Sequence, residues 1–499
     1  MVSRSRRVAR YEDLGNGKPF PYLIEDKSSY EVEFDGPNDP LSPYNWSPLK
    51  KFLCLMSLIA TSGMFSFYCG IYPVTEDAVS EEFHVGKEVS ILGIALLTVG
   101  YASGPVLWGP LSEYYGRRNI LLLGTATSCI FCFSAGSAKD LQTLLLSRIF
   151  FGFTGGASIT LVAAVCSDMF DKRNRGTMIF ISFTQMFMIT LISPIIGGFI
   201  VVNPSMGWRW VHYISGILAS GACIFAYLFC PETYGKTILG QKAAQLRAQT
   251  GNWAIYAPID LQTLDFVDTL KKSTTRPLRM LLTQPALLIT CLYVAYVYGL
   301  LFLFLQAYPI VFVEKYKMSL TISQLPFLGV VIGMGCSLIY FVIIERTHVR
   351  FLKVQNVDVY PEGRLKSMIL PGILFPVGIF WFSWMGNFPH YLPWPAPAVG
   401  GLIAGFGLLG VMLAAYTYMM ESYLELAASA MAASIFLRSI FATACPLFAD
   451  QIFYNLGIQY GGTLLGSLAA LGAVVPILFY IFAERMKRAR SPVERFEAN

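Results

Sequence analysis

The chain carries little charge. Asp, Glu, Lys and Arg make up 14% of its 499 residues, whereas a soluble domain has about 25%. Histidine is rarer still, with four residues scattered along the chain, and the patterns HExxH, GxSxG, GxxxxGKS and GxxxxGKT do not occur. These absences argue against a metalloprotease, a serine hydrolase and a phosphate-loop ATPase, because each of those activities needs its residues at that spacing.

Apolar residues are in excess: 55% of the chain is hydrophobic and the mean hydropathy is +0.54. A helix needs about 20 mostly apolar residues to cross a hydrocarbon core about 30 Å thick. Twelve segments meet that requirement, at 52–74, 89–111, 118–137, 142–166, 177–202, 209–230, 285–308, 322–344, 367–386, 395–418, 428–449 and 461–482. The first lacks the shape of a cleaved signal peptide, because a polar, proline-rich stretch precedes it. The sequence predicts an all-α membrane protein with twelve transmembrane helices in a lipid bilayer.

The segments fall into two sets of six. We expect an N-terminal tail at 1–51, a six-helix bundle at 52–230, a central loop at 231–284, a second six-helix bundle at 285–482 and a basic tail at 483–499. Leu92-Gly-Ile in the second segment recurs as Leu328-Gly-Val in the eighth, and Pro194 in the fifth matches Pro446 in the eleventh. Repeated halves of this kind predict two pseudo-symmetric bundles that rock around a site at the membrane midplane.

Positive residues are distributed unevenly over the loops. Of the 37 Lys and Arg residues, 30 lie on the side of the N-terminus and five on the other side. The remaining two, Arg148 and Arg438, lie inside apolar segments. Because cytoplasmic loops carry the excess of positive charge, both termini are expected in the cytoplasm. This distribution accounts for the net charge of +6 without a nucleic-acid partner.

Several short motifs interrupt the apolar segments. Gly109-Pro-Leu-Ser-Glu-Tyr-Tyr-Gly-Arg-Arg118 forms a charged turn between two segments, Arg148 lies inside the fourth, and Ser193-Pro-Ile-Ile-Gly-Gly198 lies in the fifth. Together they resemble the major facilitator superfamily of secondary transporters. Further stretches resemble its fungal twelve-span drug:proton antiporter group, namely Asp39-Pro-Leu-Ser-Pro-Tyr-Asn-Trp46, the block from Gly100 to Arg118, Pro231-Glu-Thr-Tyr234, and Ala428 to Arg438 with Pro446-Leu-Phe448.

The resemblance implies an efflux transporter rather than an enzyme. That group exports drugs, polyamines and secondary metabolites, so the implied partners are a small-molecule substrate and protons. No cofactor and no metal are expected, and the protein is expected to be a monomer in the plasma membrane, with the vacuolar membrane as the alternative. A polyamine or organic-acid exporter and an uncoupled facilitator of the same fold remain open. A transporter-like sensor is disfavoured, because only 17 residues follow the last segment.

The charged turn is a candidate cytoplasmic gate. Its candidate residues are Gly109, Glu113, Gly116, Arg117, Arg118 and, at the end of the fourth segment, Asp168. The glycines are expected to let two backbones approach closely. The charged side chains can bridge to a neighbouring helix end in one conformation and separate in the other. The alternative is that the two arginines only enforce topology.

Two arginines lie inside the predicted membrane. An arginine near the bilayer centre costs at least about 2.5 kcal/mol, so Arg148 should face a cavity or a paired group. Its resemblance to the superfamily's fourth-span motif implies proton coupling, with purely structural hydrogen bonding as the alternative. Arg438 lies in the family's eleventh-span pattern, which fits helix anchoring as well as transport.

The fifth segment contains a predicted bend. Pro194 removes one helix hydrogen bond, and Gly197 and Gly198 allow close packing. The family usually has glycine before this proline, whereas this chain has Ser193. The substitution predicts a stiffer bend, which keeps the facilitator open beside the antiporter.

A proton-binding group is harder to find. All 31 carboxylates are expected at segment ends or in loops, and none at mid-depth. The candidates are Glu113, Asp168 and Glu421 near the cytoplasmic surface, with Glu76 and Asp77 just outside the first segment.

Substrate contacts are expected on the helices that line the cavity in this fold. The candidates are Phe65, Tyr68, Tyr72, Tyr293, Tyr296, Gln306 and Tyr416. Aromatic rings with polar tips suit amphipathic or planar organic molecules. The alternative is that these side chains only pack, as most of the 27 Tyr and 37 Phe residues are expected to do.

Overall fold

The computed structural model describes residues 30–261, 266–355, 365–423 and 426–481. Within these ranges twelve helical units are long and apolar enough to cross a membrane, which confirms the predicted number. The first unit is α2 (Pro48–Ile71), the short helix η3 (Tyr72–Thr75) and α3 (Glu76–Phe83). The others are α4 (Lys87–Tyr115), α5 (Arg117–Gly136), α6 (Leu141–Met169), α7 (Lys172–Val202), α8 (Gly207–Phe229), α11 (Pro285–Pro309), α12 (Phe327–Gln355), α13 (Lys366–Met385), α14 (Pro395–Ser422), α15 (Ala427–Asp450) and α16 (Gly457–Ile481). Short helices continue or precede some of them, namely η5 (Ile310–Lys315), η6 (Ile322–Gln324) and η9 (Gln451–Asn455).

Local sequence signals set where the helices start. The Ser47 hydroxyl accepts the Lys50 N–H at the start of α2, and Pro48 occupies the first helical position, where its missing N–H is not needed. The Asp140 carboxylate accepts the Thr143 N–H at 2.8 Å and caps α6. Such caps satisfy backbone groups that a helix end leaves without partners.

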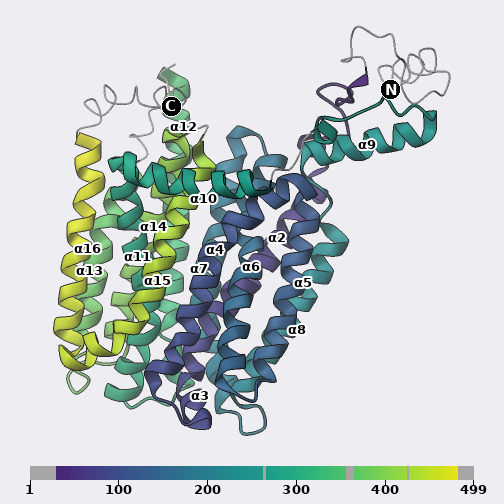
Figure 1. Cartoon of the computed structure of the whole chain (residues 1–499). Helices are drawn as coiled ribbons and strands as arrows, with labels where there is room; N and C mark the ends of the chain where they lie inside the picture. The colour runs from purple at the N-terminus through teal and green to yellow at the C-terminus, as the bar shows by residue number, and fades with distance from the viewer. Residues whose placement is uncertain (1–29, 262–265, 356–364, 424–425, 482–499) are drawn as a thin grey trace.

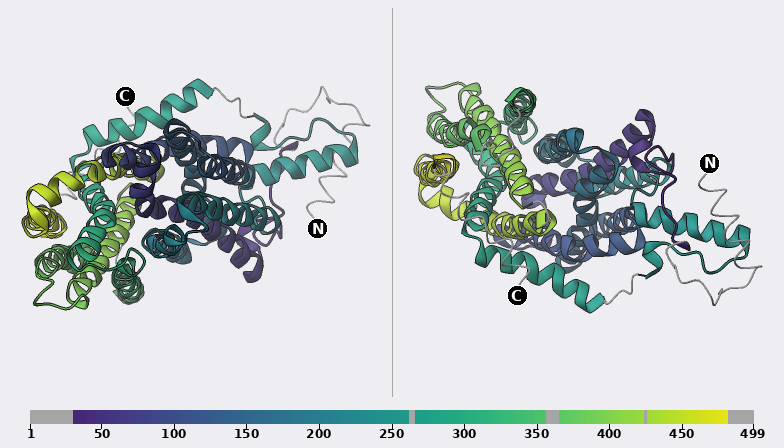
Figure 2. Two further views of the ribbon diagram at one scale, coloured as in Figure 1. Left: turned by 90° about the horizontal axis from the view of Figure 1, so that it is seen from below. Right: turned by 90° about the horizontal axis from the view of Figure 1, so that it is seen from above.

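The twelve units form two groups with the same internal contacts (Figure 2). In the first group α2 packs against α7 and α8, α4 against α6, and α5 against α6 and α8. Six spans later the same pairings recur: α11 against α15 and α16, α12 against α14, and α13 against α14 and α16. The groups meet along two seams, α4 with α15 and α7 with α12, which correspond to each other under the repeat.

Within each group, glycines bring the corresponding pair of helices into close contact. A Cβ built on Gly152 of α6 would lie 2.0 Å from the Leu97 carbonyl oxygen of α4, and one on Gly405 of α14 would lie 2.3 Å from the Val330 carbonyl oxygen of α12. Only glycine allows backbones this close, as is common where membrane helices pack. The repeated helix contacts therefore depend on glycines, which have no side chain, as well as on the side chains that pack.

The segment expected as a central loop contains two helices. α9 (Gly235–Thr250) projects beyond the first group, and α10 (Phe266–Thr283) lies across the helix ends (Figure 1). α10 contacts α4 of the first group and α15 of the second. We call this end of the molecule the α10 end and the opposite one, where α3 lies, the α3 end.

Part of the expected N-terminal tail is also structured. Tyr30 and Val32 are buried against Leu239 and Leu246 of α9. Lys242 of the same helix is buried and forms ion pairs of 3.1 Å with Asp35 and 3.7 Å with Asp39. These contacts attach residues 30–39 to the segment between the two groups of helices.

Candidate functional site

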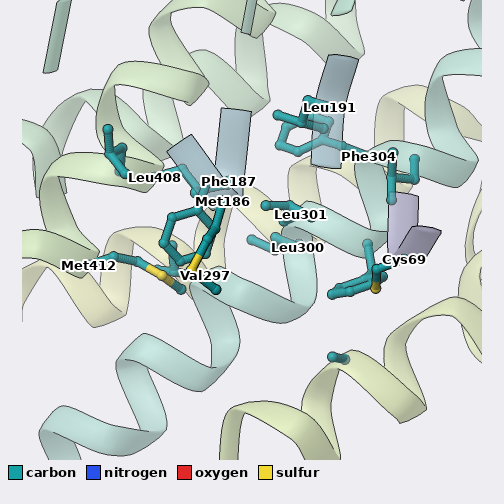
Figure 3. Packing of buried hydrophobic residues seen from close by; sticks show 14 of the residues in the cluster. Cys69, Met186, Phe187, Leu191, Val297, Leu300, Leu301, Phe304, Leu408 and Met412 are labelled. Atoms are coloured by element: carbon teal, nitrogen blue, oxygen red, sulfur yellow. The ribbon is translucent and has the colours of Figure 1, made fainter. Parts of the chain in front are cut away.

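An apolar layer joins the two groups of helices. Figure 3 shows where α7 of the first group meets α11 and α14 of the second. The side chains there are Met186, Phe187 and Leu191 of α7, Val297, Leu300, Leu301 and Phe304 of α11, and Leu408 and Met412 of α14. Polar groups buried in such a layer need partners inside the protein. Three sets of polar side chains lie at different depths: at mid-depth, nearer the α3 end and at the α10 end.

Arg438 is the centre of the mid-depth contacts. It lies halfway along α15 and is 2% exposed. Its guanidinium donates hydrogen bonds to the hydroxyls of Tyr416 on α14 and Tyr101 on α4, and stacks 4.9 Å from the Tyr298 ring centre on α11. Within the described residues no carboxylate forms an ion pair with it. Tyr101 belongs to the first group and the other residues to the second, so this cluster joins the two.

A second contact between the groups lies beside this cluster. The Thr98 hydroxyl of α4 lies 2.8 Å from the Thr443 hydroxyl of α15. The Phe183 ring of α7 lies 5.7 Å from the Tyr416 ring. Aromatic faces, phenols and one guanidinium therefore surround the level where the two groups meet, and this combination binds planar and amphipathic molecules in general.

Arg148 lies nearer the α3 end than the sequence suggested. It is the eighth residue of α6, or about 10 Å along the helix from its start, so the central position belongs to Arg438. Its Nε donates to the Gly93 carbonyl at 2.6 Å, and its guanidinium lies 3.8 Å from the Tyr72 ring centre and 4.9 Å from that of Tyr68. Its two terminal nitrogens find no hydrogen-bond acceptor in the described structure.

The Arg148 cluster continues into α8. The Tyr68 hydroxyl lies 2.9 Å from Nδ1 of His212, a fully buried histidine. Phe65 packs beside these groups, with its ring 5.6 Å from Phe151. The structure thus brings three of the predicted substrate contacts, Phe65, Tyr68 and Tyr72, together inside the first group.

Glu76 departs from its expected position. The sequence placed it just outside the first span, but it lies inside the first helical unit and is 1% exposed. Nε2 of Gln306, on α11, donates to both carboxylate oxygens at 2.9 and 3.1 Å. The burial arises because the helix continues through η3 into α3, so that Glu76 packs against the second group.

The charged turn lies at the α10 end, and its contacts stay within the first group. Nε of Arg117 lies 3.4 Å from the Asp168 carboxylate, and Nη2 lies 3.8 Å from the exposed Glu113. The Arg118 guanidinium donates to the Tyr227 carbonyl of α8 at 2.8 Å. The remaining candidate carboxylate, Glu421, is half-buried at the end of α14.

Sequence reasoning missed the residue that organises this turn. Glu232, just after α8, accepts the backbone N–H groups of Arg117 and Arg118 at 2.9 and 3.2 Å and so caps α5. A carboxylate is favoured there by the exposed N–H groups of a helix start. Gly116 has φ +92°, and a Cβ on it would lie 2.3 Å from Oε2 of Glu232. Glu232 belongs to the motif Pro231 to Tyr234, which was the available signal.

Gly109 does not act as expected. A Cβ built there meets nothing within 4 Å, so no backbone approaches it closely. The close approaches of α4 occur instead at Gly100, whose Cβ would lie 2.1 Å from the Ile149 carbonyl oxygen.

The fifth-span motif lies within α7 at the α3 end. Pro194 is inside the helix. A Cβ on Gly197 would lie 2.7 Å from Ile71 in the same group, whereas one on Gly198 would lie 3.3 Å from Gln324 and 3.4 Å from Thr321, just before α12. Gly198 thus marks a close contact between the two groups at this end.

Two predicted substrate contacts lie elsewhere. Tyr293 packs against Gly372 of α13 and Gly472 of α16. Tyr296 donates its hydroxyl proton to the Leu465 carbonyl of α16 at 2.6 Å. Both therefore hold helices of the second group together and face away from the first. Tyr101 and Tyr298, which do meet between the groups, were not predicted, although Tyr101 lies in the quoted motif after Gly100.

This architecture, with polar clusters at the meeting of two repeated six-helix groups, defines a membrane transporter of the two-bundle type. Residues 53–446 match the profile of the Major Facilitator Superfamily, and the chain belongs to that family. It is 40% identical over 481 residues to the multidrug transporter TPO1_2 of Candida glabrata, covering 95% of this chain and 82% of that one. It is 38% identical over 465 residues to the citrinin biosynthesis cluster MFS transporter mrr1 of Monascus ruber, covering 92% and 91%.

The fold also matches solved structures. The human organic anion transporter MFSD10 (TETRAN) aligns with a TM-score of 0.58 at 16% identity, covering 86% of this chain and all of that one. The protein is therefore a multi-pass membrane transporter of small molecules and not an enzyme.

Proposed function

We propose that the protein exports small amphipathic organic molecules, such as drugs, toxins or secondary metabolites, in exchange for protons. The observation that carries this proposal is the cluster of Arg438, Tyr101, Tyr298 and Tyr416 at mid-depth, built from both groups of helices. Alternating access exposes the meeting surface of two bundles first to one side and then to the other. Aromatic side chains and a cation at that level suit planar, partly polar substrates.

The contacts between the groups indicate what moves. Arg438 with Tyr101, Thr98 with Thr443, and the contacts of Gly198 each join opposite groups, so separation at one end must break those nearest to it. In contrast, the Glu232 cap and the Arg117 pairs lie within the first group. We assign the Glu232 cap and the Arg117 pairs to holding the charged turn rigid while the whole bundle rocks. The candidate gate at this end is the contact of α4, the helix that leads into the turn, with α10 and α15.

Orientation and driving force complete the proposal. The excess of Lys and Arg on one side supports a cytoplasmic position for both termini and for the α10 end. The proposed location is the plasma membrane, with the vacuolar membrane as the alternative. A monomer suffices, because one chain contains both bundles. Buried ionisable groups inside membrane spans mark ion and substrate pathways by default, which favours a proton gradient as the driving force.

Transport in inside-out membrane vesicles tests the proposal. Vesicles with an acidic lumen should accumulate a cationic rhodamine ester above equilibrium, and a protonophore should abolish the accumulation. Vesicles without the protein serve as the control. Accumulation that never exceeds equilibration, with or without the gradient, would identify a facilitator, and uptake no greater than in control vesicles would rule out this substrate class.

One observation favours a second candidate, an organic-acid exporter. Arg438 is buried with phenols as its hydrogen-bond acceptors, and its Nε finds no acceptor in the described structure. A substrate carboxylate would satisfy such a guanidinium better than a phenol does. Fluorescein, an aromatic acid, compared with the rhodamine ester in the same vesicles separates the two candidates. Selective uptake of the acid would favour the organic-acid exporter.

A further inference from the structure

Glu76 has an unusual set of partners for a buried carboxylate. Both of its oxygens accept hydrogen bonds from one neutral amide, that of Gln306. Within the described residues no Lys, Arg or His nitrogen lies within 4.0 Å of it. Its backbone carbonyl accepts a hydrogen bond of 3.0 Å from the Ser90 hydroxyl, which fixes the start of α3 against α4. The carboxylate is thus held in place without a counter-charge in contact.

The elements packed around Glu76 contribute few charges. Lys87 of α4, Asp77 of α3 and Asp450 of α15 are the charged side chains whose fields act on it. Lys87 lies 3.4 Å from Asp77, so its charge is partly compensated there. A further titratable neighbour in the first group is Tyr72 of η3, whose ring lies against the Arg148 guanidinium. The one cation and two acids whose fields act on Glu76 leave no dedicated partner for an ionised carboxylate.

We propose that Glu76 binds the proton that the protein exchanges for substrate, and that its contact with Gln306 closes the α3 end between the two groups of helices. This inference rests on the proposed proton exchange. Glu76 lies on the first group and Gln306 on the second, so the contact forms only when the α3 end is closed. Opening that end exposes the carboxylate to water on that side.

The physical basis is the cost of burying charge. An ionised carboxylate taken out of water loses more hydration free energy than hydrogen bonds from one neutral amide return. Uptake of one proton by a Glu76 oxygen forms a neutral carboxyl group that can be buried at lower cost. Closure of the α3 end is therefore coupled to proton uptake from that side. When the α10 end opens, the O–H bond breaks and the same proton leaves to water on the opposite side.

Substrate supplies the other half of the exchange. To return to the state that is open at the α3 end, the two groups of helices must pass through a closed state in which Glu76 is ionised. Substrate bound between the groups stabilises that closed state, because it adds contacts with both of them. One proton then moves inward for each outward passage of substrate, with no change in the protein over the full cycle.

Infrared difference spectroscopy tests the proton site without needing a substrate. The full chain in lipid nanodiscs is measured between acidic and alkaline buffer, and the C=O stretch of a protonated carboxyl group in an apolar environment is followed. Wild type should show this band titrating, Glu76→Gln should lack it, and Asp77→Asn should keep it. Asp77 is the matched control, because it is adjacent and its side chain is 77% exposed. Identical difference spectra of wild type and Glu76→Gln would overturn the assignment.

A transport measurement separates this inference from the proposed function. Glu76→Gln keeps the size of the side chain and its ability to hydrogen-bond to Gln306, so folding and substrate exchange without a gradient should persist. Accumulation driven by a proton gradient should be lost. If wild type itself shows no response to the gradient, the proposed proton exchange fails. If wild type and Glu76→Gln respond equally, proton exchange stands and the role of Glu76 fails.

Discussion

The hydroxyl of Tyr101 accepts a hydrogen bond from the guanidinium of Arg438, although the two residues lie 337 positions apart and in opposite groups of helices. Arg438 keeps a second acceptor, Tyr416, inside its own group. A buried guanidinium needs its acceptors, since an unsatisfied charged donor carries the full cost of desolvation. The bond to Tyr101 therefore stabilises the arrangement in which the groups meet at mid-depth.

Tyr101→Phe should weaken that arrangement. The change keeps the ring and removes one acceptor of a buried cation, at a cost of about 1 to 3 kcal/mol. We expect a lower melting temperature of the purified protein and slower export. Tyr115→Phe, at the exposed end of the same helix, is the control and should melt as wild type does. Equal melting of all three proteins would show that the bond contributes nothing to the closed arrangement.

Gly116→Ala and Gly109→Ala should have opposite effects on stability. At Gly116 both φ +92° and the Glu232 carboxylate oppose a Cβ, so alanine should destabilise by about 1 to 3 kcal/mol. At Gly109 a Cβ meets open space inside a helix, so alanine should stabilise by about 0.5 to 1 kcal/mol. Thermal unfolding in detergent measures both. A destabilising Gly109→Ala would mean that a close backbone contact exists at this glycine after all.

The twelve spans and the two halves could be predicted because the bilayer sets the length of a helix and its hydropathy. The helix α9 could also have been predicted, since its Ala- and Gln-rich sequence ends at Gly251, a left-handed helix stop. The contacts of Arg438 could not be predicted, because no local sequence signal links Tyr101 to a residue 337 positions away. The burial of Glu76 was missed for a different reason. The run Thr75-Glu-Asp looks like a solvated helix end, and only the packing of α11 shows that it is buried.

Asp168→Asn should impair export more than Glu113→Gln. Arg117 and Asp168 are mostly buried, with side chains 10% and 19% exposed, whereas Glu113 is 62% exposed. A largely buried charged hydrogen bond contributes about 1.5 to 3 kcal/mol, and an exposed pair about 0 to 1 kcal/mol. Initial export rates at equal abundance in the membrane compare the two variants. Equal rates would remove Asp168 from the proposed rigid turn.

Arg148→Ala should abolish transport and leave the protein in the membrane. The guanidinium is buried, with one carbonyl acceptor and two aromatic rings around it, and a buried cation of this kind is retained in a membrane protein for function. Export and abundance at the cell surface are measured together, with Arg148→Lys to separate charge from shape. Near-normal export by Arg148→Ala at equal abundance would make the arginine structural.

Gly198→Leu should prevent the α3 end from closing. Even a Cβ at Gly198 would lie 3.3 to 3.4 Å from Gln324 and Thr321 of the opposite group, and the rest of a leucine side chain cannot fit where packing leaves no void. We expect a folded protein that no longer exports, with faster hydrogen exchange in residues 72–83 and 310–324. Gly221→Leu on α8, where a Cβ meets nothing within 4 Å, adds the same bulk and should export normally. If Gly198→Leu instead exported at the wild-type rate, the close contact at the α3 end would not be needed in the transport cycle, and Glu76 and Gln306 would have to meet without it.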